Sequence, residues 1–369
     1  MKLAYLQQVY ERPGPFATAY LDTSVEAEDA AKAVELRWRS TRERLAGQGA
    51  DEATLDALSR HVDEHEWRIG QHGQVLVGQQ GEVVLSDELP QPPREMTEQE
   101  QAHVGPVPHL MPYLRLRGPR IPRVVAVVDQ AGARVRIVHA TREAECLSVE
   151  GRSVEGGAVE GGDSARTGPG DRAEENAALV GEEVSKHAAN IGAKAIVLAG
   201  EPQQRGLVHE RIGENVRDKV VETEAGHGDR KASDESLQRQ VAETVESIVR
   251  SRVDERVQEF EQQRGERKCA VEGWSQVLEA LRNEQVQTLL WADEPTHSDV
   301  DHLRVGPNPR EIARRDEELG VAPIGGTPAS AAVIRALVGT SAELILVDPE
   351  KVRLEDGVGG TLRYTTGSA

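Results

Sequence analysis

The start of the chain alternates between short apolar strands and helices with one apolar face. GPFATAYLD predicts a strand over residues 16–21, because apolar and polar side chains alternate there. Two helices are expected over residues 26–45 and 51–67, and Asp51 is of the type that caps a helix N-terminus. QVLVG and EVVL, joined by Gln79-Gln80-Gly81, predict a β-hairpin.

Prolines interrupt this pattern near residue 90. Pro90, Pro92 and Pro93 follow the hairpin closely, and proline lacks the N–H that both helices and sheets require. We therefore expect irregular chain up to Pro112, then a short strand over residues 113–116. This strand closes a first part of mixed structure, residues 1–117.

The middle of the chain has the order of an α/β layer. RVVAVVD and ARVRIVHA, joined at Gln130-Ala131-Gly132, predict a second hairpin, and residues 146–150 a third strand. AKAIVLAGE is apolar almost throughout, which is typical of a strand buried on both faces. With a further strand in VRDKVVETEA and helices over 172–191 and 234–262, residues 118–262 form an expected middle domain.

The last part again alternates helix and strand. Helices are expected over residues 274–281, 309–319 and 328–338, and strands in VQTLLWA, ELILVD and GTLRY. This pattern predicts an α/β sandwich over residues 265–369. The expected fold class is therefore α/β (α+β) with three domains, of which the first is mixed.

Composition narrows the possible classes of protein. A net charge of −19 argues against coating of nucleic acid or of an anionic membrane. No apolar run approaches the roughly 18 residues of a membrane span, and the polar N-terminus does not resemble a signal peptide. Cys146 and Cys269 lie in different expected domains, and no Cys/His cluster has zinc spacing. We expect a cytoplasmic protein without cofactor, metal or disulfide, and we interpret His61 and His65 as part of a solvated helix face.

A glycine-rich stretch separates the third strand of the middle domain from the helix after it. Residues 151–171 read GRSVEGGAVEGGDSARTGPGD and have neither helical nor strand periodicity. Loops this long are usually functional or disordered, and composition alone leaves both possibilities open. The stretch lacks the Gly-Lys-Ser/Thr ending of a phosphate loop and the context of a dinucleotide fingerprint.

Three groups of basic residues are candidates for RNA contact in this acidic chain. They are Arg37 and Arg39 on the first expected helix, Arg115, Arg117 and Arg120 at the end of the first part, and His227, Arg230 and Lys231 in the loop AGHGDRKAS. Only the local field matters at a phosphate contact. The alternatives are a salt-bridged helix face for the first group and, for the third, a solvated connection capped by Ser233 or Asp234. No catalytic motif of a hydrolase is visible.

Several segments together resemble a known superfamily. GPFATAYLD, VVAVVDQAGARVRI, ARRDEELG and DGVGGTLRY occur in an order of three domains that resembles the archaeal and eukaryotic peptide-chain release factor and Pelota superfamily. The chain looks most like its actinobacterial branch, which is related to the ribosome hibernation factor Balon. In this superfamily the first domain addresses the decoding region, the middle one the peptidyl-transferase centre, and the last a translational GTPase.

The resemblance places residues 151–171 where release factors carry Gly-Gly-Gln. Here the candidates are Gly156-Gly157-Ala158 and Gly161-Gly162-Asp163, and neither has the glutamine. An Asn-Ile-Lys-Ser stop-codon motif is also missing from residues 1–117. The resemblance thus implies a non-enzymatic, ribosome-bound stress or hibernation factor that contacts A-site rRNA. Elongation factor Tu or a related GTPase would bind its third domain. The alternative is a peptidyl-tRNA hydrolase of rescue or termination that uses Asp163 or His227.

Overall fold

The computed structural model describes residues 1–25, 30–65, 70–140, 144–150, 169–225, 230–266, 268–293 and 302–364. The chain divides into two compact units. Unit 1 comprises Met1–Pro119 and Val253–Ala369, and unit 2 comprises Arg120–Arg252. The α/β fold class predicted from the sequence is confirmed, since each unit combines helices with sheets.

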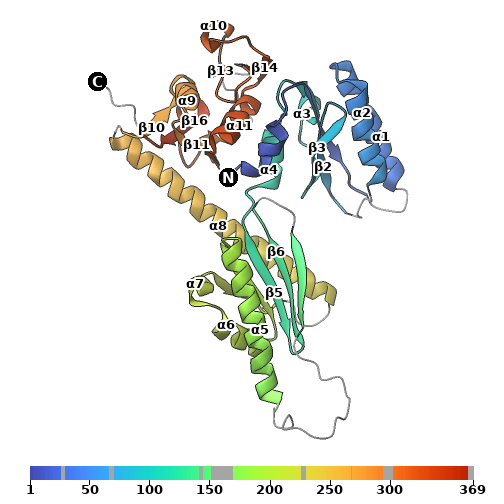
Figure 1. The fold of residues 1–369 in the computed structure, drawn as a ribbon, viewed down its shortest axis with the longest axis vertical. Helices are drawn as coiled ribbons and strands as arrows, with labels where there is room; N and C mark the ends of the chain where they lie inside the picture. Colours follow the sequence, from blue (N-terminus) through green and yellow to red (C-terminus); the bar gives the residue numbers. More distant parts are fainter. Residues whose placement is uncertain are drawn as a thin grey trace. The chain divides into compact units, whose positions relative to one another are not determined.

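The N-terminal segment of unit 1 contains one antiparallel sheet with strand order β3-β2-β1-β4. Its elements are η1 (Ala4–Tyr10), β1 (Phe16–Asp22), α1 (Ala30–Gly47), α2 (Glu52–Glu64), β2 (Gly73–Gln79), β3 (Glu82–Leu89), α3 (Glu98–Gln101), β4 (Ala102–Gly105) and α4 (Met111–Arg117). Figure 1 shows α1 and α2 side by side over this sheet. As predicted, Asp51 caps α2: its Oδ1 accepts a hydrogen bond from the Thr54 amide at 2.9 Å.

β1 is buried on both faces, and its successive side chains point alternately into two different hydrophobic cores. Ala17, Ala19 and Leu21 pack with α1 and α2. Phe16 and Tyr20 point the other way, into a core that also contains residues of the C-terminal segment such as Trp274. This shared core is why the first and last parts of the chain form one compact unit.

The C-terminal segment of unit 1 contains two sheets, with strand orders β10-β16-β11-β15 and β13-β12-β14. Its elements are β10 (Ala270–Glu272), α9 (Gly273–Arg282), β11 (Val286–Ala292), β12 (His302–Val305), β13 (Ile312–Ala313), α10 (Asp316–Leu319), β14 (Gly325–Pro328), α11 (Ala329–Thr340), β15 (Glu343–Val347), η2 (Glu355–Gly357) and β16 (Val358–Leu362). Strands β11 and β15 are parallel, and α11 is almost entirely buried.

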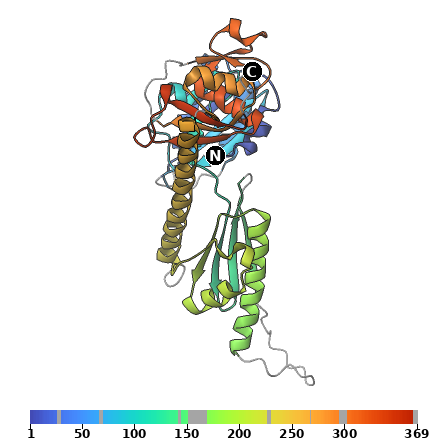
Figure 2. The same ribbon diagram turned by 90° about the vertical axis from the view of Figure 1, so that its left-hand side faces the viewer.

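Unit 2 is built on a five-stranded sheet with strand order β7-β6-β5-β8-β9. Its elements are β5 (Arg123–Asp129), β6 (Gly132–Val138), β7 (Glu145–Glu150), α5 (Pro169–Asn190), β8 (Ala195–Gly200), α6 (Pro202–Arg211), α7 (Glu214–Arg217), β9 (Val220–Glu222) and the start of α8 (Arg230–Glu266). β5, β8 and β9 are parallel, and every residue of β8 is buried. Both views show α5 along one face of the sheet (Figures 1 and 2).

Three local predictions are wrong. Residues 113–116 form α4 rather than a strand, because Pro112 suits the first turn of a helix and Gly118 ends it at a φ of 66°. Residues 309–319 are mostly not helical, since Ile312 pairs with Val305 in a sheet and only α10 is a helix. The proline-rich segment up to Pro112, expected to be irregular, contains α3 and β4.

Candidate nucleic-acid interface

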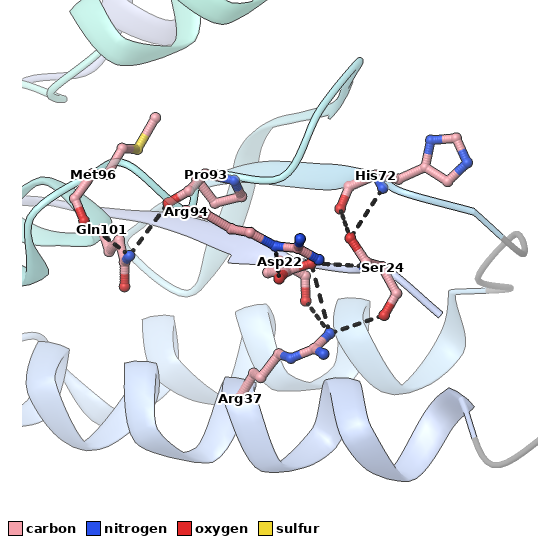
Figure 3. Close-up of polar contacts among 8 residues, drawn as sticks. All are labelled: Asp22, Ser24, Arg37, His72, Pro93, Arg94, Met96 and Gln101. Carbon is pink, nitrogen blue, oxygen red and sulfur yellow. Dashed lines mark hydrogen bonds and ion pairs between the residues drawn. The ribbon is translucent and has the colours of Figure 1, made fainter. Parts of the chain in front are cut away.

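A cluster of polar side chains joins the end of β1 to α1 and to the segment before α3 (Figure 3). Asp22 lies at its centre, with a side chain 22% exposed. Its Oδ1 accepts a hydrogen bond from the Ser24 amide at 2.9 Å, and its Oδ2 accepts one from Arg94 Nε at 3.3 Å. Arg37 on α1 donates to the carbonyl oxygens of Asp22 and Ser24 at 2.9 and 3.0 Å. The cluster thus holds two guanidinium groups around one carboxylate.

The charge of Asp22 is stabilised by these neighbours. Partial burial raises the pKa of the carboxyl, but the hydrogen bonds from Ser24, the charge of Arg37 and the hydrogen bond from Arg94 outweigh it, so the pKa is lowered overall. Asp22 is therefore an anion at neutral pH and balances one of the two arginines. With two guanidinium groups beside one carboxylate, the cluster carries a net positive charge.

The segment that carries Arg94 is held in place by hydrogen bonds on both sides of it. Gln101 Nε2 donates to the carbonyl oxygens of Pro93 and Met96 at 3.3 and 3.1 Å (Figure 3). Thr97 and Glu100 form a reciprocal capping box at the start of α3. Arg94 is therefore aimed at Asp22 by a fixed backbone.

Sequence reasoning found Arg37 but missed Arg94 and Asp22. The Arg94–Asp22 contact joins residues 72 positions apart, so no local pattern could predict it. Arg94 directly follows the prolines for which we expected an irregular segment. A proline-rich segment does not by itself indicate that one of its arginines forms an ion pair.

Three further predicted arginines also belong to unit 1, but each forms an ion pair of its own outside the Asp22 cluster. Arg39, on α1, forms an ion pair with Glu35 at 3.3 Å. Arg115 and Arg117, on α4, pair with Asp293 at 2.7 Å and with Asp87 at 2.9 Å. A phosphate that approached these side chains would have to compete with a carboxylate already in contact.

The remaining candidates are less fully described. Arg120 is half-buried between α4 and β5. Arg230 and Lys231 lie in the first turn of α8, so the helix begins before Ser233 and neither Ser233 nor Asp234 is its N-cap. His227 lies outside the described residues. So do the loop residues Gly156, Gly157, Gly161, Gly162 and Asp163.

Neither a metal-binding cluster nor a membrane-spanning helix occurs within the described ranges. There, no three His, Cys, Asp or Glu side chains are placed to hold a metal ion. His61, one of the two histidines at helical spacing, contacts the hydroxyl of Ser86 at 2.8 Å through its Nε2. None of the described helices is long and apolar enough to cross a bilayer.

The middle of the chain matches a known family. Residues 122–266 match the family model named bacterial archaeo-eukaryotic release factor family 2. The matched segment covers most of unit 2 and the whole of α8. It confirms, for this part of the chain, the predicted resemblance to a bacterial branch of the archaeal and eukaryotic release factor and Pelota superfamily. The closer likeness to Balon stays a prediction.

Relatives extend over the whole chain at low identity. An uncharacterized protein of Mycobacterium tuberculosis strain H37Rv is 24% identical over 383 residues, which covers 99% of this chain and 97% of that protein. Among solved structures, an archaeal translation termination factor is 16% identical, with a TM-score of 0.25 over 96% of this chain and 93% of that one. A ribosome-bound archaeal Pelota is 14% identical, with a TM-score of 0.40 over 98% and 93%. These sequence identities and TM-scores are too low for the roles of residues in those proteins to be assigned to residues of this chain.

Proposed function

We propose that this protein is a ribosome-associated, release-factor-like factor that occupies the A site under stress, without reading stop codons or releasing peptide. The observation that carries the proposal is the family match over residues 122–266, combined with a loop sequence that lacks the glutamine of Gly-Gly-Gln. The domain type is retained while the group that positions water for hydrolysis is replaced. This combination favours binding over catalysis.

The chemistry of the replacement supports the same interpretation. At the second Gly-Gly pair, Asp163 stands where a release factor has glutamine. An ionised carboxylate only accepts hydrogen bonds, whereas an amide also donates them. The carboxylate is moreover repelled by the phosphates of RNA. Asp163 is therefore a poor substitute for the catalytic amide in a site made of RNA.

Binding to the ribosome must overcome an unfavourable overall charge. The net charge of −19 repels rRNA at long range, and Arg39, Arg115 and Arg117 are in ion pairs with carboxylates. Delivery by elongation factor Tu or a related GTPase, bound to the C-terminal segment, would replace electrostatic steering. Because these three candidate arginines are already paired with carboxylates, we expect ribosome binding to depend only weakly on salt.

The rival function is peptidyl-tRNA hydrolysis, and a release assay separates the two. Ribosomes loaded with labelled peptidyl-tRNA are incubated with the purified full-length protein, and peptide release is followed over time. We expect release at the rate of the buffer control, for the wild type and for Asp163→Ala alike. Rapid release that Asp163→Ala abolishes would establish the hydrolase instead.

Association with ribosomes in the cell is tested by sedimentation. A stationary-phase lysate of the source organism is separated on a sucrose gradient, and each fraction is probed for the protein. We expect it in the ribosomal fractions. Its restriction to the top of the gradient would remove both the occupancy function and the hydrolase.

A further inference from the structure

The sheet of unit 2 exposes two arginines that sequence reasoning did not select. Arg134 and Arg136 lie two positions apart on β6, so their side chains point to the same face of the sheet. Both are exposed, and neither forms a hydrogen bond or an ion pair in the part of the chain that the structure describes. In this they differ from Arg39, Arg115 and Arg117, whose charges are already balanced by carboxylates.

The strand register explains why these two arginines have no carboxylate partner. On β7 the residues directly opposite Arg134 and Arg136 are Ser148 and Cys146, and on β5 they are two valines. Residues directly opposite on adjacent strands are the nearest side-chain neighbours on a sheet face. None of these neighbours is a carboxylate, so the two guanidinium groups keep their full charge.

Positive charge prevails over the middle of this face. Arg123 on β5 points to the same side as the β6 arginines and is half-buried. The carboxylates that β5 and β7 contribute to the face, Asp129 and Glu150, both lie at the hairpin end, level with Gly132. Asp129 Oδ1 already accepts hydrogen bonds from the amides of Ala131 and Gly132, at 2.8 and 3.0 Å. The charge that remains available is therefore that of the β6 arginines.

The two arginines lie on the open part of their sheet face. On the β5 and β8 part of the face, Val125 and Val197 are only 8% and 0% exposed. On β6 and β7, in contrast, both arginines are exposed, and so are Ser148 and Cys146 beside them. The opposite face of the sheet is covered by α5 (Figures 1 and 2). The small side chains of β7 leave the guanidinium groups accessible to a large ligand.

The number and type of these cations indicate the ligand. Anionic membranes are usually bound by clusters of about four to eight basic residues, more than this face provides. Guanidinium groups instead bind single phosphates through two parallel hydrogen bonds. Strands β5, β6 and β7 lie within residues 122–266, which match the release-factor family. With this match, the choice of RNA as the phosphate carrier rests on the proposed function.

We propose that the exposed strip formed by β6 and β7 contacts the phosphate backbone of ribosomal RNA through Arg134 and Arg136. The hydroxyl of Ser148 adds a neutral donor to the same strip. Because phosphate contacts carry no sequence information, the strip positions the protein on RNA of any sequence. Two such contacts contribute about 1.5 to the slope of log K against log salt concentration, which agrees with a weak salt dependence.

Charge-matched variants test the proposal by co-sedimentation of the full-length protein with purified vacant ribosomes over a series of salt concentrations. The double variant Arg134→Gln/Arg136→Gln should bind about tenfold more weakly at low salt, with a salt slope smaller by about 1.5. The control, Lys186→Gln/Arg211→Gln, loses the same charge from exposed positions on α5 and α6, where both cations are in ion pairs. It should bind as the wild type does.

The outcomes separate this proposal from the proposed function. Equal binding by the wild type and the arginine variant would overturn the role of the strip and leave ribosome association intact. Equal weakening in both double variants would show that only net charge matters, which also overturns it. If the wild type does not bind ribosomes at all, the proposed function fails, and the strip loses its ligand with it.

The exposed thiol of Cys146, directly opposite Arg136, gives a second test that needs no change in the strip. A benzophenone maleimide is attached to Cys146 in a Cys269→Ser background, and the ribosome-bound protein is irradiated. We expect an adduct with ribosomal RNA that ribonuclease removes. An adduct with ribosomal protein alone would assign the strip to a protein partner, and bound protein without any adduct would show that the strip faces away from the ribosome. Either result would overturn the proposal.

Discussion

At the scale of single residues, Asp22 shows how an acidic chain positions its arginines. The carboxylate lies between Arg37 and Arg94, at 3.7 Å from the first and 3.3 Å from the second. Arg37 also bonds two backbone carbonyl oxygens, so its orientation does not depend on Asp22 alone. The carboxylate therefore adds charge stabilisation to a geometry that the backbone already favours.

Replacing Asp22 by asparagine tests this role. The Asp22→Asn variant keeps an acceptor for the Ser24 amide but loses the charge. At pH 7 we expect it to lower the free energy of unfolding by about 1 kcal/mol, because partly exposed pairs are screened by water. The pKa of Asp22 is lowered in the folded protein, so its contribution is present above the unfolded pKa of about 3.9 and is lost as the pH falls through the folded pKa.

Urea unfolding of the two proteins at pH 7 and at about pH 3 measures this difference. The gap between wild type and Asp22→Asn should shrink at the lower pH. Asp63→Asn, a change of an exposed carboxylate on α2, is the matched control and should have little effect at either pH. A gap of the same size at both pH values would show that charge is not what Asp22 contributes.

At the scale of elements, the sheet of unit 2 depends on one close backbone approach. Gly200 ends β8 with a φ of 115°, and a Cβ at this position would lie 2.0 Å from the carbonyl oxygen of Val128 on β5. Neither the conformation nor the space tolerates a side chain. Gly206, within α6, has an open environment where a Cβ would meet nothing within 4 Å.

The two glycines predict opposite effects of alanine. Gly200→Ala should reduce the stability of unit 2 by about 3 kcal/mol or more, because backbone strain and a collision add together. Gly206→Ala should raise it by about 0.5–1 kcal/mol, since alanine restricts the unfolded chain and favours the helix. Thermal unfolding followed by far-ultraviolet circular dichroism measures both. Similar midpoints for the two variants would show that the β5–β8 contact is not this tight.

The sequence predicts most elements whose pattern is local. The hairpins, the wholly apolar β8 and the Asp51 cap follow from spacing and residue type alone, and the structure confirms them. The wrong predictions are those in which contacts with residues distant in sequence determine the secondary structure. Ile312 joins Val305 in a sheet, and residues 113–116 become a helix in which Tyr113 and Leu114 are fully buried. The Asp22 cluster also joins segments far apart in sequence, which no local pattern reveals.

At the scale of the whole molecule, the proposed function rests on a retained domain and a changed loop. The family match covers residues 122–266, and the loop sequence within it contains Gly-Gly-Ala and Gly-Gly-Asp but no Gly-Gly-Gln. A protein of this kind can fill the space of a tRNA without performing the chemistry of release. The proposed function therefore depends on which ribosomal site the protein occupies.

Competition with tRNA tests that claim most directly. Binding of the labelled full-length protein to purified vacant ribosomes is measured by co-sedimentation, with and without a tRNA in the A site. Because the expected delivery partner affects the rate of binding, elongation factor Tu with GTP is included in a parallel series. We predict saturable binding to vacant ribosomes that A-site tRNA abolishes. Equal binding to ribosomes with a filled A site, or no binding in either series, would contradict the account.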